Sequence, residues 1–440
     1  MRTRSLVLLA TVVALAAIVR AQQRAPAPAL VRAGRVLDVR SGVYRADQGI
    51  WIDGGRIKQI GAFDAVRAAA PRDAVVIDLG RAAVMPGLID CHTHLLDAMD
   101  PAISPQDNLL LTLTKDGPAK RALLGAAMAR EMIDAGFTTV RNVGHSGIDG
   151  DVALRDAIRA GWLPGPRITA SGRKIAPLGG QALQVQHGVA QAIIDQEFLA
   201  VSSPPEGRRA VLENLRVGAD AIKVVADDWP RVIGEDTLKA IVDEAHRVGV
   251  RVAAHATTKL GIQAALDAGV DSIEHGDEAT DAQFKAMHDK GIFLVPTLWP
   301  RELLPITRAL AARPDVGTLV EGYLASERTK LERATKAGVR IAFGSDMWFG
   351  YGEKTRGQAT RLVLEALATF GMPPLDALRA ATVDAAALLN VGDAVGALEA
   401  TKYADLIAVD GDPLANLRDL QNVKFVMKGG AVVRDELHAR

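Results

Sequence analysis

Six side chains that can bind metal ions lie within or at the end of short apolar runs of this sequence. They are His92 and His94 in the triplet His-Thr-His, Lys223 in Ala-Ile-Lys-Val-Val, then His255, His275 and Asp346. Imidazole and carboxylate groups are ligands for divalent transition metals. Because side chains alternate along a strand, His92 and His94 would point to the same side. The set therefore predicts a metal site.

The pair His92-Thr93-His94 has a second interpretation, in which both histidines are structural. Nine histidines in 440 residues give about 0.2 such pairs by chance, so the pair alone is moderately specific. However, four of the nine histidines, together with Asp346, lie at the C-terminal ends of strand candidates. This common placement favours metal binding.

Lys223 lies in an apolar run, where burial of an ammonium group lowers its pKa and favours the neutral amine. A neutral buried lysine can react with carbon dioxide to form an anionic carbamate, which bridges two cations. The alternative is a lysine that extends along the strand edge to solvent. The nearby histidines favour the carbamate.

The middle of the chain, residues 86–388, alternates β-branched runs with stretches of helical spacing such as Gly234–Val248 and Leu260–Ala268. The strand candidates are Gly87–His94, Thr138–Gly144, Arg167–Lys174, Ala221–Val225, Arg251–His255, Ser272–Gly276, Phe293–Leu298 and Arg340–Asp346. Eight strands alternating with helices predict an α/β fold, a parallel (β/α)8 TIM barrel. Active sites of such barrels lie at the C-terminal ends of the strands.

The two ends of the chain are rich in β-strand patterns instead. Residues 25–85 contain a hairpin pattern around Asp53-Gly54-Gly55, and residues 389–440 contain strand candidates at Asp405–Val409 and Val423–Met427. Neither end alone buries much apolar surface. We therefore expect both ends to combine in one small β-sandwich.

Residues 1–21 have the pattern of a secretory signal peptide, with Arg2 and Arg4 before an apolar run that ends near Ala21. The run is too short to span a membrane, so we expect an exported periplasmic or secreted protein without stable membrane association. The 52 basic and 52 acidic side chains balance, which argues against nucleic-acid binding. A single cysteine excludes an internal disulfide.

The sequence resembles the amidohydrolase superfamily, in its two-metal subtype. The resemblance rests on Met85–His94, on the ordered set of six ligand candidates, and on Lys402–Leu406 followed by Asp410–Pro413. It implies that His92, His94 and Asp346 bind one metal and that His255 and His275 bind the other. Carbamylated Lys223 would bridge the two ions, and zinc is the expected metal.

The mechanism that this resemblance implies is hydrolysis by a metal-bridging hydroxide. Two cations lower the pKa of a shared water from about 16 toward about 7. Asp346 would move the proton to the leaving nitrogen, with Lys223 and His275 as the other catalytic residues. Single-metal deaminases of the superfamily carry His-x-x-Glu after the fifth strand, whereas this chain reads His255-Ala-Thr-Thr, which disfavours deamination.

Within the superfamily, the chain is most similar to the imidazolonepropionase-like branch. That branch includes Xaa-Pro dipeptidases (prolidases), other metallo-carboxypeptidases and ochratoxin-hydrolysing amidases. Gly136–Arg141 and Val252–Ala256 fit the branch. Two loops differ, because many relatives read Thr-Gly-Gly-His at Leu178–Gln181 and carry a glycine-rich loop at Ala226–Trp229.

The expected substrate is a small amide or dipeptide with a bulky or aromatic acyl group and a free carboxylate. The candidate substrate-binding residues are His145, Arg173, Lys174, Trp229, Trp299, Trp348 and Tyr351. Aromatic side chains at a cavity mouth favour flat apolar ligands. His145, Arg173 and Lys174 are the candidates for binding the carboxylate, and Arg173 is favoured because its guanidinium can bind in bidentate fashion. The aromatic residues could equally pack loops onto the barrel.

Two other functions remain open from the sequence. The same site suits an esterase, lactonase or phosphotriesterase, and the same fold could serve a non-catalytic binding protein. We also expect a homo-oligomer.

Overall fold

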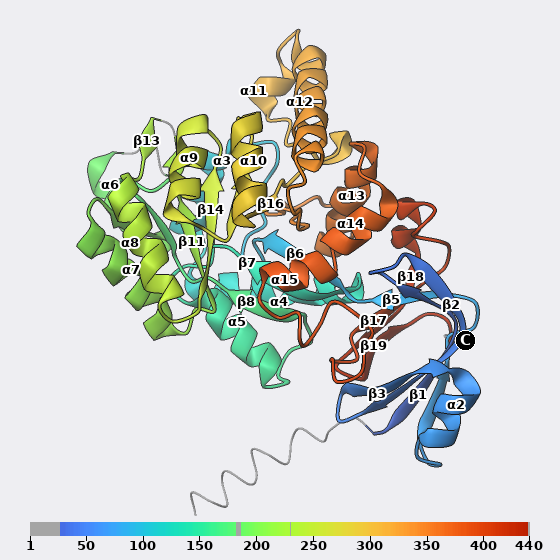
Figure 1. Ribbon diagram of the computed structural model, residues 1–440. Coiled ribbons are helices and arrows are strands. Elements are labelled where there is room, and N and C mark those ends of the chain that lie inside the picture. Colours follow the sequence, from blue (N-terminus) through green and yellow to red (C-terminus); the bar gives the residue numbers. More distant parts are fainter. Residues whose placement is uncertain (1–26, 182–185, 229, 439–440) are drawn as a thin grey trace, which may run out of the picture.

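The computed structural model describes residues 27–181, 186–228 and 230–438 (Figure 1). The predicted signal peptide, residues 1–21, and Trp229 lie outside the described residues. Within the described part of the chain, no helix combines the length and apolar character needed to cross a bilayer.

The two ends of the chain pair in one eight-stranded sheet, in the order β19-β18-β17-β5-β1-β2-β3, with β4 also beside β1. Its strands are β1 (Ala29–Asp38), β2 (Val43–Asp53), β3 (Arg56–Ala62), β4 (Val75–Asp78), β5 (Ala83–Pro86), β17 (Leu406–Val409), β18 (Val423–Lys428) and β19 (Ala431–Asp435). Both ends do associate, and β1 pairs with β2, β4 and β5. The Gly55 turn between β2 and β3 lies against the Gly429 carbonyl between β18 and β19, so distant parts of this strand order fold back onto each other.

The hairpin between β2 and β3 turns at Gly54 and Gly55, which have φ values of 59° and 76°. Positive φ is a conformation that glycine adopts without steric cost. Helix α2 (Phe63–Ala69) follows β3 and packs against β2. Buried side chains of both chain ends, including Ile50 and Phe425, form one apolar cluster that holds the sheet together.

The rest of the molecule is an α/β structure built on parallel strands. One group contains β6 (Leu88–Thr93), β7 (Phe137–Asn142) and β8 (Arg167–Ala170). A second group, in the order β10-β9-β11-β14-β15-β16, contains β9 (Lys174–Pro177), β10 (Phe198–Val201), β11 (Ala221–Val225), β14 (Arg251–Ala256), β15 (Ser272–His275) and β16 (Phe293–Val295). The third expected strand is thus split into β8 and β9, and β10 is an addition.

The eighth expected strand, Arg340–Asp346, is not a regular strand, although it lies where a strand was expected. Isolated parallel bridges join Leu294 to Ile341 and Thr93 to Met347. The Cys91 amide also donates a hydrogen bond to the Phe343 carbonyl, at 2.8 Å. The segment therefore links β16 to β6, the two strands at the ends of the groups.

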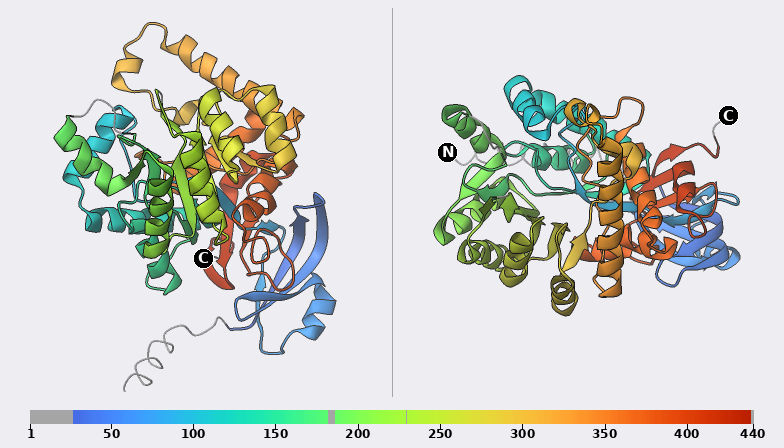
Figure 2. Two further views of the ribbon diagram at one scale, coloured as in Figure 1. Left: turned by 60° about the vertical axis from the view of Figure 1, so that its left-hand side comes forward. Right: turned by 90° about the horizontal axis from the view of Figure 1, so that it is seen from above.

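Helices flank these strands and cover their outer faces (Figures 1 and 2). For example, α8 packs against α7, α9 and β14. The helices are α3 (Pro105–Lys115), α4 (Pro118–Asp134), α5 (Gly150–Arg159), α6 (His187–Glu197), α7 (Pro204–Val217), α8 (Glu235–His246), α9 (Lys259–Ala268), α10 (Asp281–Lys290), α11 (Arg308–Ala311), α12 (Val316–Lys336), α13 (Arg356–Thr369), α14 (Pro374–Ala380) and α15 (Val383–Leu388). Short elements are β12 (Asp227–Asp228), β13 (Arg231–Val232), η1 (Arg301–Leu303) and η2 (Leu417–Asn422).

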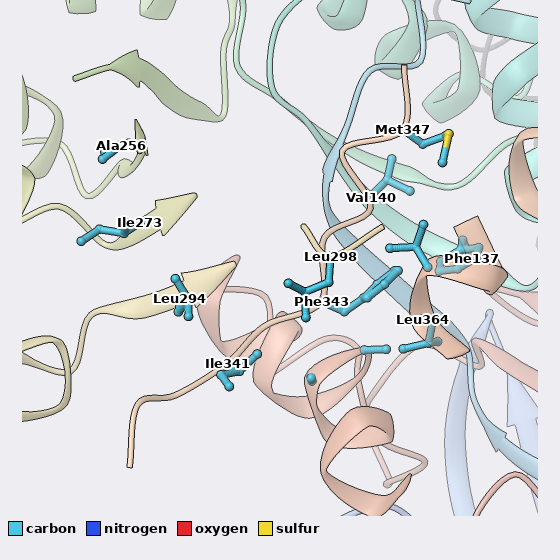
Figure 3. Packing of buried hydrophobic residues seen from close by; sticks show 14 of the residues in the cluster. Phe137, Val140, Ala256, Ile273, Leu294, Leu298, Ile341, Phe343, Met347 and Leu364 are labelled. Atoms are coloured by element: carbon cyan, nitrogen blue, oxygen red, sulfur yellow. The ribbon is translucent and has the colours of Figure 1, made fainter. Parts of the chain in front are cut away.

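A large apolar core packs against the irregular eighth segment, Arg340–Asp346. Phe343 lies beside Phe137 and Leu364 in this core (Figure 3). The Phe137 and Phe343 rings stack with centroids 6.0 Å apart. These contacts fix the segment that carries Asp346 without a complete strand ladder.

Candidate metal centre

The six predicted ligands surround one small cavity of about 110 Å³. The cavity is lined by His92, His94, His145, Lys174, Gln181, Lys223, His255, His275, Asp346 and Trp348. Strand register explains the convergence, because Lys223 pairs with Ala253, two residues before His255, and Ala256 pairs with His275. Neighbouring parallel strands thus bring these side chains to the same end of the structure.

The ligand atoms of His92, His275 and Asp346 all lie within 4.8 Å of one another. The Asp346 Oδ1 atom is 3.3 Å from His92 Nε2 and 3.1 Å from His94 Nε2. His255 stands next to His275, with ring centroids 4.6 Å apart. The described residues therefore offer one continuous set of nitrogen and oxygen donors.

Three of these histidines have their Nδ1 atom engaged by another group. His92 Nδ1 lies 2.6 Å from Glu274 Oε2, His94 Nδ1 lies 3.1 Å from the Gly144 carbonyl, and His275 Nδ1 lies 2.8 Å from Thr297 Oγ1. Such partners orient an imidazole ring and favour one tautomer. They leave the Nε2 atoms available for a metal ion.

Burial favours the neutral, metal-binding form of three ligand histidines. Burial lowers the pKa of His94 to about 4 and that of His275 to about 3, and burial also moves the pKa of His255 well below its usual value. A neutral imidazole has a free lone pair for coordination. For Asp346, burial raises the pKa, but His92 and His94 outweigh it and hold the pKa well below its usual range.

Lys223 fits the role of a carbamate precursor. Its side chain is buried, and its Nζ atom has no hydrogen-bond partner among the described residues. Burial lowers its pKa to about 8, so part of the population is a neutral amine at physiological pH. An orphaned buried amine among neutral imidazoles and a carboxylate fits a site for two divalent cations.

Several site residues have a strained backbone. Four non-glycine residues with positive φ lie at the ends of these strands, namely His145 (55°), His275 (71°), Thr297 (49°) and Asp346 (49°). Each such conformation costs about 1–3 kcal/mol and persists where the surrounding structure enforces it. Strain of this kind is concentrated at functional sites.

The sequence reasoning missed Glu274 and Arg141, which lie beneath the site. Glu274 is fully buried, accepts from His92 through one oxygen, and pairs with Arg141 at 2.8 Å through the other. Strict alternation along β15 would place Glu274 and His275 on opposite faces. The positive φ of His275 breaks this alternation, so that His275 lines the metal cavity while Glu274 contacts His92. The one available signal was a buried-looking glutamate in Ser-Ile-Glu-His.

Gly344 is a second residue that the sequence reasoning did not single out. A Cβ atom at this position would lie 2.6 Å from His92 Cβ and 2.4 Å from Val295 Cγ1. Only glycine therefore lets the segment before Asp346 approach β6 this closely.

The predicted substrate residues separate into two groups. His145, Lys174 and Trp348 line the metal cavity. Arg173 does not reach it, because its guanidinium binds Glu213 at 3.2 Å and the Asp195 carbonyl at 2.9 Å. The structure therefore does not support the expected carboxylate contact of Arg173.

Two aromatic candidates lie outside the metal cavity. The Tyr351 hydroxyl donates to the Leu303 carbonyl, and its ring contacts Phe349, away from the metal cavity. Trp299 donates to the Ser345 carbonyl at 2.7 Å and lines a second cavity.

This second cavity has a volume of about 360 Å³ and opens beside the metal cavity. The two cavities share His275 and Asp346. The larger one is mostly apolar, with Leu304, Pro305, Ile306, Leu310, Leu319 and Val320 in its walls. They come from the segment after β16 and from α12.

Comparisons with known proteins agree over most of the chain. Residues 83–433 match the model of the Amidohydrolase family. Ochratoxinase from Aspergillus niger is 31% identical over 389 residues, which cover 80% of this chain and 75% of that protein. Imidazolonepropionase from Deinococcus radiodurans is 25% identical over 411 residues, which cover 88% and 90%.

Solved structures of similar proteins also match over most of this chain. A Xaa-Pro dipeptidase with bound methionine in the active site is 29% identical, with a TM-score of 0.79, over 93% of this chain and 100% of that one. The crystal structure of A. niger ochratoxinase is 26% identical, with a TM-score of 0.79, over 94% and 96%.

Proposed function

Because this chain belongs to the amidohydrolase family and is a hydrolase acting on C–N bonds, we propose that it cleaves the amide bond of a bulky or aromatic N-acyl amino acid or dipeptide. The observation that carries the proposal is a polar cavity of ligand residues that shares His275 and Asp346 with an apolar cavity of about 360 Å³. The name of the relative ochratoxinase supports an ochratoxin-type amide as one substrate of this class.

The proposal includes a closed (β/α)8 barrel over residues 86–388, with residues 25–85 and 389–440 in the accessory β-structure. The bridges of the 340–347 segment to β16 and β6 support closure. We also propose that the protein is exported after cleavage of a signal peptide near Ala21 and that it forms a homo-oligomer. Sequencing of the mature N-terminus and light scattering test these two points.

Two divalent cations, expected to be zinc, would be held by His92, His94, His255, His275, Asp346 and carbamylated Lys223. When bound, such ions polarise the scissile carbonyl and lower the pKa of a water molecule toward neutrality. The orphaned Nζ atom of Lys223 and the neutral imidazoles support this assignment.

Asp346 is the residue proposed to move the proton. Its carboxylate lies at the junction of the two cavities and is held ionised, so it can accept a proton from the attacking water. The protonated oxygen can then donate to the leaving nitrogen of the amide. Glu274 keeps His92 in a fixed orientation beside it.

The larger cavity is proposed to hold the acyl group. Its apolar walls favour flat, weakly hydrated groups, and its volume suits a group the size of a bicyclic aromatic ring. Trp299 contributes an aromatic face to this cavity.

The test is a hydrolysis panel with zinc-loaded protein. It compares an aromatic N-acyl-phenylalanine with N-acetyl-glycine, with the matching ester and with a phosphotriester, and D346N is the control for contaminating hydrolases. We expect the aromatic amide to have the highest kcat/KM. A higher value for the ester or the phosphotriester would replace amide hydrolysis with those chemistries.

A further inference from the structure

Lys174 is a buried cation in the wall of the metal cavity. Its side chain is 3% exposed at the first position of β9. The Nζ atom lies 2.9 Å from His145 Nε2 and donates to Gln181 Oε1 at 2.6 Å. The ammonium also lies 4.7 Å from the centre of the Phe198 ring. All of these partners are formally neutral.

Within the described ranges, no carboxylate lies at ion-pair distance from Lys174. Two other cations show the more usual arrangement. Arg173 next to it pairs with Glu213, and Lys330 pairs with Asp277 at 2.8 Å. Burial of an ammonium group without a counter-ion is costly, so an anion at this position would relieve an existing penalty.

The packing around Lys174 holds its side chain in place. A Cβ atom on Gly144 would lie 2.5 Å from Lys174 Cγ, so the stem passes directly over this glycine. Gly144 has a φ of 109°, which other residues rarely adopt. Burial lowers the pKa of Lys174 to about 8, so the amine is still largely protonated at pH 7. The loop at 144–145 thus positions a charged group at the cavity.

We propose that Lys174, held by His145 and Gln181, binds the free carboxylate on the amino-acid part of the substrate. The inference rests on the proposed function and assigns the orientation of the substrate. Lys174 lines the small cavity but not the large one, so the amino-acid part would lie near Lys174 and the acyl group in the apolar cavity. Arg173 has no part in this recognition.

The experiment compares K174M with R173Q, which removes the neighbouring cation outside the cavity. Each variant is assayed on an aromatic N-acyl-phenylalanine and on the same compound with an amidated C-terminus. Loss of a charge-assisted hydrogen bond corresponds to about 10- to 100-fold in affinity. K174M should therefore raise KM for the acid by about this factor and leave KM for the amidated compound nearly unchanged. R173Q should change neither value.

Binding of L-phenylalanine, measured by calorimetry, gives a readout independent of turnover. Wild type and R173Q should bind it, and K174M should bind at least about 10-fold more weakly. If wild type cleaves neither compound, the proposed function fails, and the calorimetry alone decides the role of Lys174. Equal acid preference in K174M and wild type would overturn the inference. Loss of metal in K174M, with equal loss of rate on both compounds, would also overturn it by showing that the charge serves the metal site.

Discussion

The two adjoining cavities differ in how the chain builds them. The small cavity is lined by polar side chains at strand ends, and several buried polar atoms around it lack partners among the described residues, including Lys223 Nζ and Asp97 Oδ2. The large cavity is mostly apolar and is built by a connecting segment and by α12. The comparison shows that residues at the ends of the strands supply the metal-binding groups. The segment after β16 and α12 form the larger, apolar cavity.

The largest effect is expected in the small cavity, at Asp346. D346N retains an oxygen that can bind metal but cannot move a proton, a step worth about 10²–10⁴ in rate. We expect kcat to fall by this factor with much of the metal retained. The check is kcat together with elemental analysis of the same sample, and a near wild-type kcat would assign the proton transfer to another group.

Lys223 gives the next largest effect. K223A removes the proposed bridging ligand and should lower the metal content, with loss of most activity. A small carboxylate such as propionate should partly restore both, because its oxygens can take the place of the carbamate. Since the Arg guanidinium does not form the carbamate, K223R serves as the control, and full activity in K223R would make the lysine structural.

The large cavity should respond differently. V320W would fill part of it, and we expect kcat/KM for an aromatic N-acyl substrate to fall by about 10-fold. The rate on N-acetyl-glycine and the metal content should stay unchanged. Equal losses on both substrates would show that the two cavities are not separate in function.

The smallest effect is expected at Asp97, and it concerns stability. The Asp97 Oδ2 atom lies 3.8 Å from Nδ1 of His145, which lines the small cavity. Burial raises its pKa to about 7, with Arg121 and Arg356 opposing and Glu197 adding to the rise. The folded state therefore holds this proton more tightly than the unfolded chain, and stability is lost as pH rises from about 4 to about 7.

D97N should remove this dependence. Its free energy of unfolding, relative to wild type, should increase over that pH window by a few kcal/mol at most. Denaturant unfolding at pH 4 and pH 7.5 checks the prediction. A constant difference between the two proteins at both pH values would contradict it.

The same contrast between strands and loops explains what the sequence could predict. Periodicity identified β11 at its observed bounds, and it placed His255 and His275 on adjacent strands. It did not reveal that Arg340–Asp346 is irregular, because its position depends on Gly344, which permits the close approach to His92. Burial patterns cannot encode such long-range contacts.

The substrate side was less predictable for a related reason. Arg173 and Lys174 are adjacent in sequence, and only the structure shows that Arg173 turns outward to Glu213 while Lys174 turns to the cavity. The large cavity depends on the placement of α12, which no motif marks. Glu274 was not predicted as a site residue, because strand alternation places it on the face opposite to His275. The positive φ of His275 breaks that alternation.

The central claim is that each chain holds two divalent ions around Lys223, and metal stoichiometry tests it most directly. Elemental analysis of protein purified without chelator, combined with intact mass measurement for the carbamate, would be made across a zinc titration. The account predicts a plateau at two ions per chain, which falls toward one or fewer in K223A. A plateau at one ion with unmodified Lys223 would contradict it.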